Sequence, residues 1–443
     1  MGCTGSTSLV DGQTIMASSS LTTIALGDGQ ATRAQQQGPR PQPQQKALGG
    51  PSAANLAGGR ASFHNCYVLD GKLGRGAFAQ VHLARGVARG EEAAVKITDL
   101  RTGDLTPGKP DYRKLRAAQK EATILRKVAE CEHCVQAYED FADDSFFYLV
   151  MERCDHTLLQ VLERLPEVKE YVLARLASDM LRALNHIHSL NIVHRDVKPD
   201  NFLCCGFKHV VKLCDFGLAE VLSHPTAELK GVYGTAPFMS PEMLKVQGYG
   251  TLTDVWSLGV ILYTLLFGQF PYQPVEATTK AMKAAIIAGQ PQPTFKPKLD
   301  LDMGGRSRAS PGAVSFLRAC LCRDPGLRIS ARDALGQAWV SSDEDQPARK
   351  SQPSLRPMLY AARRAGAFDV RKVNDSESNS MDIALCAMQA KYRTGGCGAP
   401  AARRAERPTT SECDTASVRL ARTDSTTEHT NLTPLTSSSQ SYN

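Results

Sequence analysis

The sequence predicts an α+β fold, with strands in the first third of the chain and long helices after them. The segments at 91–97 and 146–154 are apolar runs of strand length. The segment at 171–190 carries apolar residues at intervals of three and four, which predicts a long amphipathic helix. The continuous apolar run at 255–268 is best explained as a buried helix.

The two ends of the chain lack a core-forming pattern. Residues 1–60 are dominated by Gly, Gln, Ser, Thr, Ala and Pro, and residues 341–443 are rich in Ser, Thr, Arg and Glu. Such segments bury too little apolar surface to offset the entropy lost on folding. The sequence therefore predicts one folded domain at 64–340, between a disordered N-terminal tether and a mostly disordered C-terminal tail.

Charge and cysteine content exclude several classes of protein. The net charge of +7 is spread thinly, without a Lys/Arg block or an aromatic and basic stripe, so nucleic acid is not an expected partner. The thirteen cysteines are scattered apart from Cys204-Cys205, and they match neither a disulfide framework nor a zinc pattern. The CxxC spacing of Cys131 and Cys134 lacks a second pair. The cysteines therefore indicate a reducing compartment.

No signal for membrane spanning or secretion is present in the sequence. The apolar run at 255–268 is too short to cross a bilayer. No charged segment precedes an apolar one at the start, because the first basic residue is Arg33. We therefore expect a cytoplasmic protein.

The segment at 73–81 reads as strand, turn, strand. Gly74 and Gly76 let the backbone pass close to phosphates, where a side chain would collide. The third glycine of the usual pattern is replaced by Ala79. Lys96 follows an apolar strand about fifteen residues later, and a lysine in that place can pair with the α- and β-phosphates of a nucleotide.

Three short motifs carry the chemistry: HRDVKPDN at 194–201, CDFG at 214–217 and GTAPFMSPE at 234–242. Asp196 supplies a carboxylate that can accept a hydroxyl proton. Asn201 and Asp215 supply hard oxygen ligands for magnesium. Together these groups are the equipment for phosphoryl transfer.

In these motifs the chain resembles the eukaryotic protein kinase family, serine/threonine type, over roughly residues 64–340. The motif details are most similar to the calcium/calmodulin-dependent group. The resemblance implies a bilobal fold, with a small, mainly antiparallel β lobe with one helix at 64–153 and a larger, mainly helical lobe at 154–340. It also implies transfer of the γ-phosphate of ATP, with Mg²⁺ as cofactor, to Ser and Thr hydroxyls of protein substrates.

The resemblance assigns roles to individual residues. Asp196 would orient the attacking hydroxyl and accept its proton, and Lys198 would point at the transferred phosphate. Glu121, on a predicted helix, would form an ion pair with Lys96. Asn201 and Asp215 would hold the metal. The other residues expected around the nucleotide are Leu73, Gly74, Gly76, Phe78, Val81, Ala94, Met151, Glu152 and Cys154, the last two through their backbone.

Other motif residues are expected to support the site. His194 would pack beneath Phe216, so it is not counted as a base. The glycine pair that often follows the connector between the lobes is missing, which leaves Asp155 as the candidate for the ribose contact. The remaining structural contacts that the resemblance implies are those of Thr235 and Asp254 with the catalytic loop and of Glu242 with Arg328.

Regulation is open at this level. In the family, an arginine at the position of Arg195 often forms an ion pair with a phosphate on the activation segment. No Ser or Thr lies at 229–234, where the phosphate acceptor is usual. Three alternatives are open. Ser223 or Thr226 would accept the phosphate, Glu228 would supply a permanent negative charge in its place, or the segment is ordered without modification. Low dependence on phosphorylation is the favoured alternative.

The first six residues predict an anchor. Gly2 and Ser6 fit the N-myristoylation pattern, and Cys3 is a candidate for palmitate. One myristoyl chain binds membranes with an association constant on the order of 10⁴ M⁻¹, so stable anchoring needs Cys3 as a second signal. Chance is the alternative for so short a match. We expect attachment to the cytoplasmic face of a membrane.

Three further functions are less favoured. The basic segment at 358–373 is a weak candidate for calmodulin binding, and no EF-hand loop is present in the sequence. A membrane-tethered scaffold that uses the fold only for binding is disfavoured by the intact catalytic residues. A small-molecule phosphotransferase is disfavoured by the peptide-binding segment at 234–242.

Overall fold

The computed structural model describes residues 62–75, 79–101, 110–297, 309–341 and 352–364, together with residues 366, 385 and 388. The predicted tether and acylation site at 1–60 lie outside the described residues, and so do Gly76 and Phe78 of the glycine-rich turn. All described residues belong to one structural unit.

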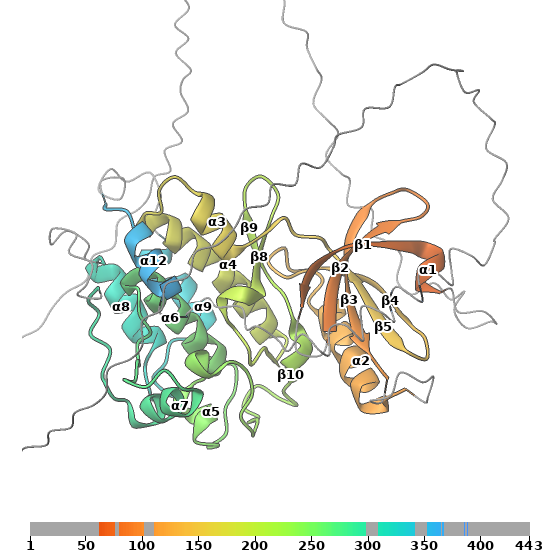
Figure 1. Cartoon of the computed structure of the whole chain (residues 1–443). Coiled ribbons are helices and arrows are strands. Elements are labelled where there is room, and N and C mark those ends of the chain that lie inside the picture. Colours follow the sequence, from red (N-terminus) through yellow and green to blue (C-terminus); the bar gives the residue numbers. More distant parts are fainter. Residues whose placement is uncertain are drawn as a thin grey trace, which may run out of the picture. The chain divides into compact units, whose positions relative to one another are not determined.

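The first part of the chain folds into the predicted small β lobe (Figure 1). Its five strands form one antiparallel sheet in the order β1-β2-β3-β5-β4. The strands are β1 (Tyr67–Arg75), β2 (Ala79–Gly86), β3 (Glu92–Asp99), β4 (Ala137–Ala142) and β5 (Phe146–Met151). A single helical turn, α1 (Phe63–Cys66), precedes the sheet, and α2 (Tyr112–Lys127) connects β3 to β4.

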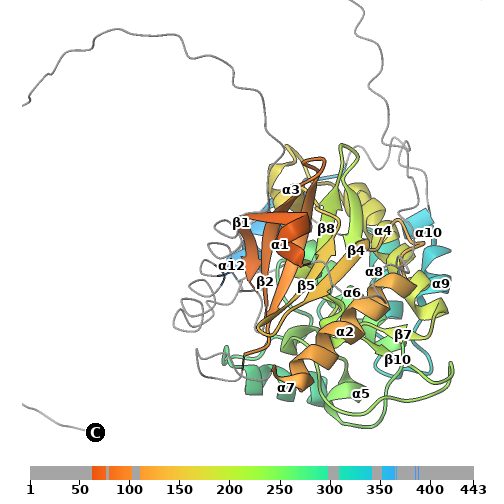
Figure 2. The same cartoon turned by 90° about the vertical axis from the view of Figure 1, so that its right-hand side faces the viewer.

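Helix α2 packs beside the sheet (Figure 2). Asp111 caps its first turn, because the Asp111 carboxylate accepts hydrogen bonds from the backbone N–H groups of Arg113 and Lys114. The buried face of α2 includes one carboxylate, that of Glu121. Its buried residues are Ala118, Glu121, Ala122, Ile124 and Leu125.

Strand β5 is buried on both faces, which explains its continuous apolar sequence. Phe147 and Leu149 belong to the core shared with α2 and the large lobe. Phe146 and Tyr148 point to the other face and belong to a separate cluster there. Phe63 of α1 covers this outer face, with its ring stacked 4.4 Å from that of Tyr148.

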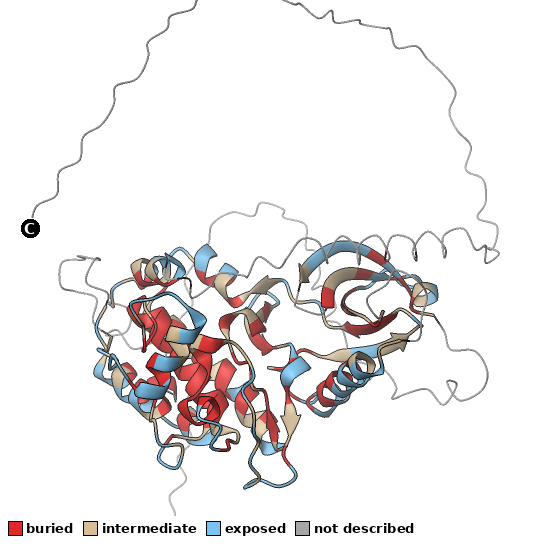
Figure 3. Ribbon diagram, turned by 60° about the horizontal axis from the view of Figure 1, so that its bottom comes forward, coloured by how far each residue is buried: buried red, intermediate tan, exposed pale blue. Residues whose placement is uncertain are grey.

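The second part of the chain is mainly helical, as predicted, and its buried residues concentrate at its centre (Figure 3). The longer helices α4 (Glu170–Ser189) and α6 (Leu252–Phe267) match the two predicted ones. The others are α3 (Leu158–Arg164), α5 (Pro241–Leu244), α7 (Thr279–Ala288), α8 (Pro311–Cys320), α9 (Ala331–Leu335) and α10 (Ala338–Ser341). Within the described part of the chain, no helix has the length and apolar character that crossing a membrane requires.

Two small sheets hold the motifs. One has the order β6-β8-β9, and in the other β10 pairs with β7. Their strands are β6 (His156–Thr157), β7 (Ile192–Val193), β8 (Phe202–Cys205), β9 (Val210–Leu213) and β10 (Glu220–Val221). The HRDVKPDN motif runs between β7 and β8, and CDFG runs between β9 and β10. Both motifs are therefore fixed at each end by strand pairing.

The C-terminal tail contains a helix that the prediction of a mostly disordered tail did not include. Helix α12 (Arg356–Arg364) packs against α6, with Met358 and Ala362 fully buried. Leu385 is also described, and it belongs to the cluster on the outer face of the small-lobe sheet. The tail therefore contributes apolar side chains to both cores.

Candidate active site

Three side chains from distant parts of the chain meet at the centre of the site. The Nζ atom of Lys96 on β3 lies 2.6 Å from Oε1 of Glu121 on α2 and 2.7 Å from Oδ1 of Asp215. Both contacts are within hydrogen-bonding distance. The predicted ion pair is confirmed, and the lysine of the small lobe reaches the aspartate of the CDFG motif directly.

Lys96 and Asp215 stabilise each other in the charged state. Burial opposes the charge of Lys96, but the carboxylates of Glu121 and Asp215 outweigh it and raise the pKa of the ammonium. The nearby Lys96 charge lowers the pKa of Asp215 to about 2, against the effect of burial. Lys96 therefore stays protonated and Asp215 stays ionised throughout the neutral range.

The catalytic loop forms a second cluster around Asp196. Oδ2 of Asp196 accepts a hydrogen bond of 2.7 Å from Nζ of Lys198, and Oδ1 accepts one of 2.8 Å from the Thr235 hydroxyl. The side-chain amide of Asn201 donates to the backbone oxygen of Asp196 at 2.8 Å. The predicted contact of Thr235 with the catalytic loop is confirmed.

Gly234 allows the activation segment to approach the loop this closely. Its φ is +96°, and a Cβ atom there would lie 2.3 Å from the backbone oxygen of Arg195 and 3.2 Å from Oδ1 of Asp196. Only glycine fits both the conformation and the space. The position of Thr235 against Asp196 depends on this residue.

Asp254 of α6 supports the loop from below, as the resemblance implies. Its carboxylate accepts hydrogen bonds from the backbone N–H groups of His194, at 2.9 Å, and Arg195, at 3.0 Å. Arg195 and Asp215 both have positive φ, of 67° and 60°. Such conformations cost about 1–3 kcal/mol each and persist only where neighbouring contacts impose them.

His194 has a structural position. Its ring lies 5.0 Å from the ring of Phe216 in an edge-to-face arrangement, and its Nε2 atom lies 3.1 Å from the backbone oxygen of Cys214. The ring is fully buried. The expectation that His194 packs against Phe216 is confirmed.

Strand register aligns the described residues predicted to contact the nucleotide. Gly74 pairs with Val81, which in turn pairs with Lys96. Two positions before Lys96, Ala94 pairs with Met151. Side chains two residues apart on a strand share a face, so Ala94 and Lys96 point the same way. Leu73, on β1 beside Gly74, is 51% exposed.

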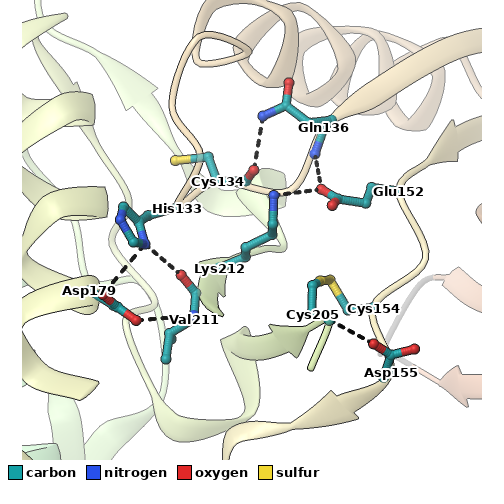
Figure 4. The surroundings of a disulfide bond; sticks show 11 residues. His133, Cys134, Gln136, Glu152, Cys154, Asp155, Asp179, Cys205, Val211 and Lys212 are labelled. Atoms are coloured by element: carbon teal, nitrogen blue, oxygen red, sulfur yellow. Dashed lines mark hydrogen bonds and ion pairs between the residues drawn. A yellow bond between two sulfur atoms is a disulfide. The ribbon is translucent and has the colours of Figure 1, made fainter. Parts of the chain in front are cut away.

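The connector between the lobes is tied to the large lobe by several polar contacts (Figure 4). Nζ of Lys212 on β9 lies 3.0 Å from Oε2 of Glu152. The backbone N–H of Glu152 donates to the backbone oxygen of Gln136, so the Glu152 carbonyl is the backbone group left for the predicted contact with adenine. Oδ2 of Asp155 accepts from the backbone N–H of Gly206 at 2.8 Å, which directs this predicted ribose contact towards the β8–β9 turn.

A disulfide joins Cys154 to Cys205 (Figure 4). The cysteine spacing indicated no disulfide framework, and it did not predict this bridge. The two residues are 51 apart in sequence, and the pairing of β6 with β8 brings their Cα atoms to 4.7 Å. Only the folded chain makes them neighbours. The unpaired cysteines in the described part of the chain are Cys66, Cys131, Cys134, Cys204, Cys214, Cys320 and Cys322.

Arg195 has a partner that sequence reasoning missed. Its guanidinium lies 3.3 Å from Oε2 of Glu220 on β10, and its Cζ atom lies 4.2 Å from the centre of the Tyr233 ring. Nζ of Lys120 on α2 lies 2.6 Å from Oε1 of the same glutamate. Glu220 therefore links the catalytic loop to the helix that carries Glu121. The sequence signal that could have identified Glu220 is its position five residues after Asp215.

The segment at 234–242 is anchored by a buried ion pair. Both guanidinium Nη atoms of Arg328 donate to the Glu242 carboxylate, at 2.6 and 3.0 Å. The pair is predicted by the resemblance and is confirmed. The arrangement of two oxygens against two N–H groups fixes the segment in direction as well as position.

A family model of the protein kinase domain matches residues 67–340, more than half of the chain. The chain belongs to the protein kinase family. The observed architecture agrees with this assignment. An antiparallel β lobe is followed by a helical lobe, and the catalytic motifs lie beside the short strands of the helical lobe. The predicted family and fold class are confirmed.

Several of the curated relatives that match this chain are named serine/threonine kinases. Serine/threonine-protein kinase TIO of Arabidopsis thaliana is 36% identical over 258 residues, which are 58% of this chain and 18% of that protein. Serine/threonine-protein kinase sid1 of Schizosaccharomyces pombe is 31% identical over 280 residues, 63% of this chain and 54% of that protein. CDPK-related kinase 7 of Arabidopsis thaliana is 31% identical over 285 residues, which are 63% of this chain and 46% of that protein.

These relatives place the domain in the serine/threonine type. The chain matches less than two thirds of the length of each of them. A CDPK-related kinase is no more similar than the others, so the likeness to the calcium/calmodulin-dependent group is weak.

Proposed function

We propose that this protein is an ATP-dependent protein serine/threonine kinase, which transfers the γ-phosphate of ATP to Ser and Thr hydroxyls of protein substrates. The observation that carries the proposal is the meeting of Lys96 with Glu121 and Asp215, beside a catalytic loop with intact Asp196 and Lys198. A scaffold that uses the fold only for binding has no need of this constellation.

Each side chain has a task in the transfer. The hydroxyl oxygen of the substrate attacks the γ-phosphorus, the bond to the β–γ bridging oxygen breaks, and ADP leaves with that oxygen. Asp196 orients the hydroxyl and accepts its proton. Lys198, hydrogen-bonded to Asp196, neutralises charge on the transferred group. Lys96 holds the α- and β-phosphates, and Glu121 fixes the direction of its ammonium.

The residues fit magnesium. Asn201 donates its amide N–H₂ to the backbone of Asp196, which leaves its amide oxygen as a ligand, and Asp215 supplies a partly exposed carboxylate. Within the described residues no group of three or more His, Cys, Asp and Glu could hold a metal. Mg²⁺ is commonly bound by one or two protein oxygens together with phosphates and water. Magnesium would offset charge on the β- and γ-oxygens.

The test is transfer of radiolabel from γ-labelled ATP to a generic basic protein by the full chain. We expect incorporation on Ser and Thr that Asp196→Asn lowers by about 10²–10⁴-fold. The variant should retain the thermal stability of the wild type and bind nucleotide. Label transfer that is absent from the wild type, with nucleotide binding intact, supports the scaffold instead.

We also propose that the kinase is tethered to the cytoplasmic face of a membrane through myristate on Gly2 and palmitate on Cys3. The support is the sequence pattern at the start of the chain. Gly2→Ala should move the protein from the membrane fraction to the soluble fraction, and Cys3→Ser should weaken the attachment because one acyl chain binds marginally. An unchanged distribution of Gly2→Ala contradicts the proposal.

Calmodulin is a weaker candidate as partner. The basic segment at 358–373 begins within α12, whose Met358 and Ala362 are buried against the large lobe. Calmodulin takes its targets by their apolar face, so α12 would have to leave the lobe first. A calcium-dependent gel shift of the full chain with calmodulin tests this.

A further inference from the structure

The disulfide lies where the connector between the lobes meets the large lobe. Strand β6 follows the connector and pairs antiparallel with β8, with His156 opposite Cys204. The backbone N–H of Asp155 donates to the backbone oxygen of Cys204 at 3.1 Å. This pairing places Cys154 beside Cys205, and the Cα separation of 4.7 Å is within the range of disulfides.

Exposure and thiol chemistry also favour Cys154 and Cys205, and not the neighbouring Cys204, as the reactive cysteines. Cys154 and Cys205 are both partly exposed, so a reagent in solution can reach them. Cys204, next to Cys205, is 1% exposed, and burial raises its pKa to about 12. A thiol reacts as its thiolate, so Cys204 is inert beside the reactive pair.

The disulfide adds a covalent link to the polar contacts that hold residues 152–155 against the large lobe. On one side of Cys154, Glu152 pairs with Lys212 of β9 at 3.0 Å. On the other side, Asp155 accepts from the N–H of Gly206 at 2.8 Å. Figure 4 shows the disulfide lying between these two contacts. The groups that make the polar contacts do not change with the redox state, whereas the covalent link exists only when the two thiols are oxidised.

We propose that Cys154 and Cys205 form a reversible thiol–disulfide pair that tunes nucleotide affinity. In the oxidising direction hydrogen peroxide takes two electrons and two protons from the two thiols: the S–S bond forms, the O–O bond breaks, and two molecules of water leave. In the reducing direction a dithiol attacks the bridge, gives two electrons and two protons to the cysteines, and becomes a disulfide itself. The reversible bridge is compatible with a reducing compartment that meets oxidant at intervals.

The effect follows from where the bridge lies. Residues 152–154 are the part of the kinase fold whose backbone is expected to meet adenine, an expectation that rests on the family assignment. The oxidised connector cannot move away from β8, so it is preorganised for the nucleotide. Preorganisation improves affinity by reducing the ordering needed on binding, and we expect the oxidised kinase to bind an ATP analogue about three- to tenfold more tightly.

The experiment uses the full chain, treated with hydrogen peroxide or with dithiothreitol. Non-reducing peptide mapping should find the Cys154 and Cys205 peptides joined only after peroxide. Titration with a fluorescent, non-hydrolysable ATP analogue should give the lower Kd for the oxidised sample. Cys205→Ser should show one Kd under both conditions, whereas Cys322→Ser, a matched change at a partly exposed free cysteine, should keep the redox response.

Two results would overturn the proposal. One is the absence of the joined peptides after oxidation, which removes the bridge itself. The other is joined peptides with the same Kd in both states, which removes its effect on nucleotide. Neither result depends on phosphoryl transfer, so an inactive enzyme and an ineffective bridge are distinguished.

Discussion

At the scale of single residues, the site depends on short contacts that admit few substitutions. Lys96, Glu121 and Asp215 are joined by contacts of 2.6 and 2.7 Å, and their charges fix one another. The resemblance to the kinase family predicted each of these residues. The lengths of the contacts, and the glycine that lets Thr235 reach Asp196, come from the folded chain.

Gly234→Ala tests the close approach of the activation segment to the catalytic loop. The new Cβ atom would lie 2.3 Å from the Arg195 oxygen at a φ of +96°, so the segment must shift. A displacement of about 1 Å can reduce turnover on the order of 10²-fold. Steady-state kinetics should show a loss of that size in kcat. Gly250→Ala is the control, because its Cβ atom meets nothing nearer than 4.0 Å; equal losses in both variants would contradict the explanation.

The acid stability of the domain should depend on Asp215. Lys96 lowers the pKa of this carboxyl in the folded protein to about 2, and its ordinary value is about 3.9. The lowered pKa contributes stability that is fully present above pH of about 4 and is lost as the pH falls towards 2. In urea unfolding between pH 5 and pH 3, Asp215→Asn should therefore lose less stability on acidification than the wild type. The exposed Asp144→Asn should behave as the wild type.

At the scale of elements, β10 connects the catalytic loop to α2. Glu220 contacts Arg195 at 3.3 Å and Lys120 at 2.6 Å, so the Arg195 guanidinium already has a carboxylate partner without a phosphate on the activation segment. Of the alternatives that the sequence left open, Glu228 is not the residue that pairs with Arg195. The glutamate that does so lies three residues after the CDFG motif, on a strand too short to predict.

Glu220→Gln should lower kcat, because it removes the charge that holds Arg195 and Lys120 together. Partly exposed ion pairs contribute up to about 1 kcal/mol each, so a loss of about fivefold is expected. The double variant Ser223→Ala/Thr226→Ala should keep nearly full activity. Near-complete loss of turnover in the double variant, with little change in Glu220→Gln, would show that activation requires phosphate.

At the scale of the whole molecule, the two cores extend beyond the kinase domain. Helix α12 packs on the large lobe, and Leu385 lies in the outer cluster of the small lobe. The polar composition of the tail obscured these short apolar patches. A fragment that ends near residue 345 would lack both.

Met358→Ala tests the contribution of α12. The side chain is fully buried, and removing a buried methionine costs about 2–5 kcal/mol of unfolding free energy. Thermal denaturation should show a clear decrease in Tm. Tyr360→Ala, on the same helix but 62% exposed, should change Tm little. Similar stabilities of the two variants would mean that α12 is not held on the lobe in solution.

The sequence motifs identified the family and, through it, predicted the order of the lobes and the residues proposed to react, because the catalytic motifs of that family combine particular side chains at particular spacings. The sequence also predicted α4 and α6, whose apolar patterns are long enough to be unambiguous. Tertiary structure alone decided the Cys154–Cys205 bridge, the Arg195–Glu220–Lys120 link and the docking of α12. Each joins residues far apart in the chain, and such contacts depend on strand pairing and packing that no local pattern records.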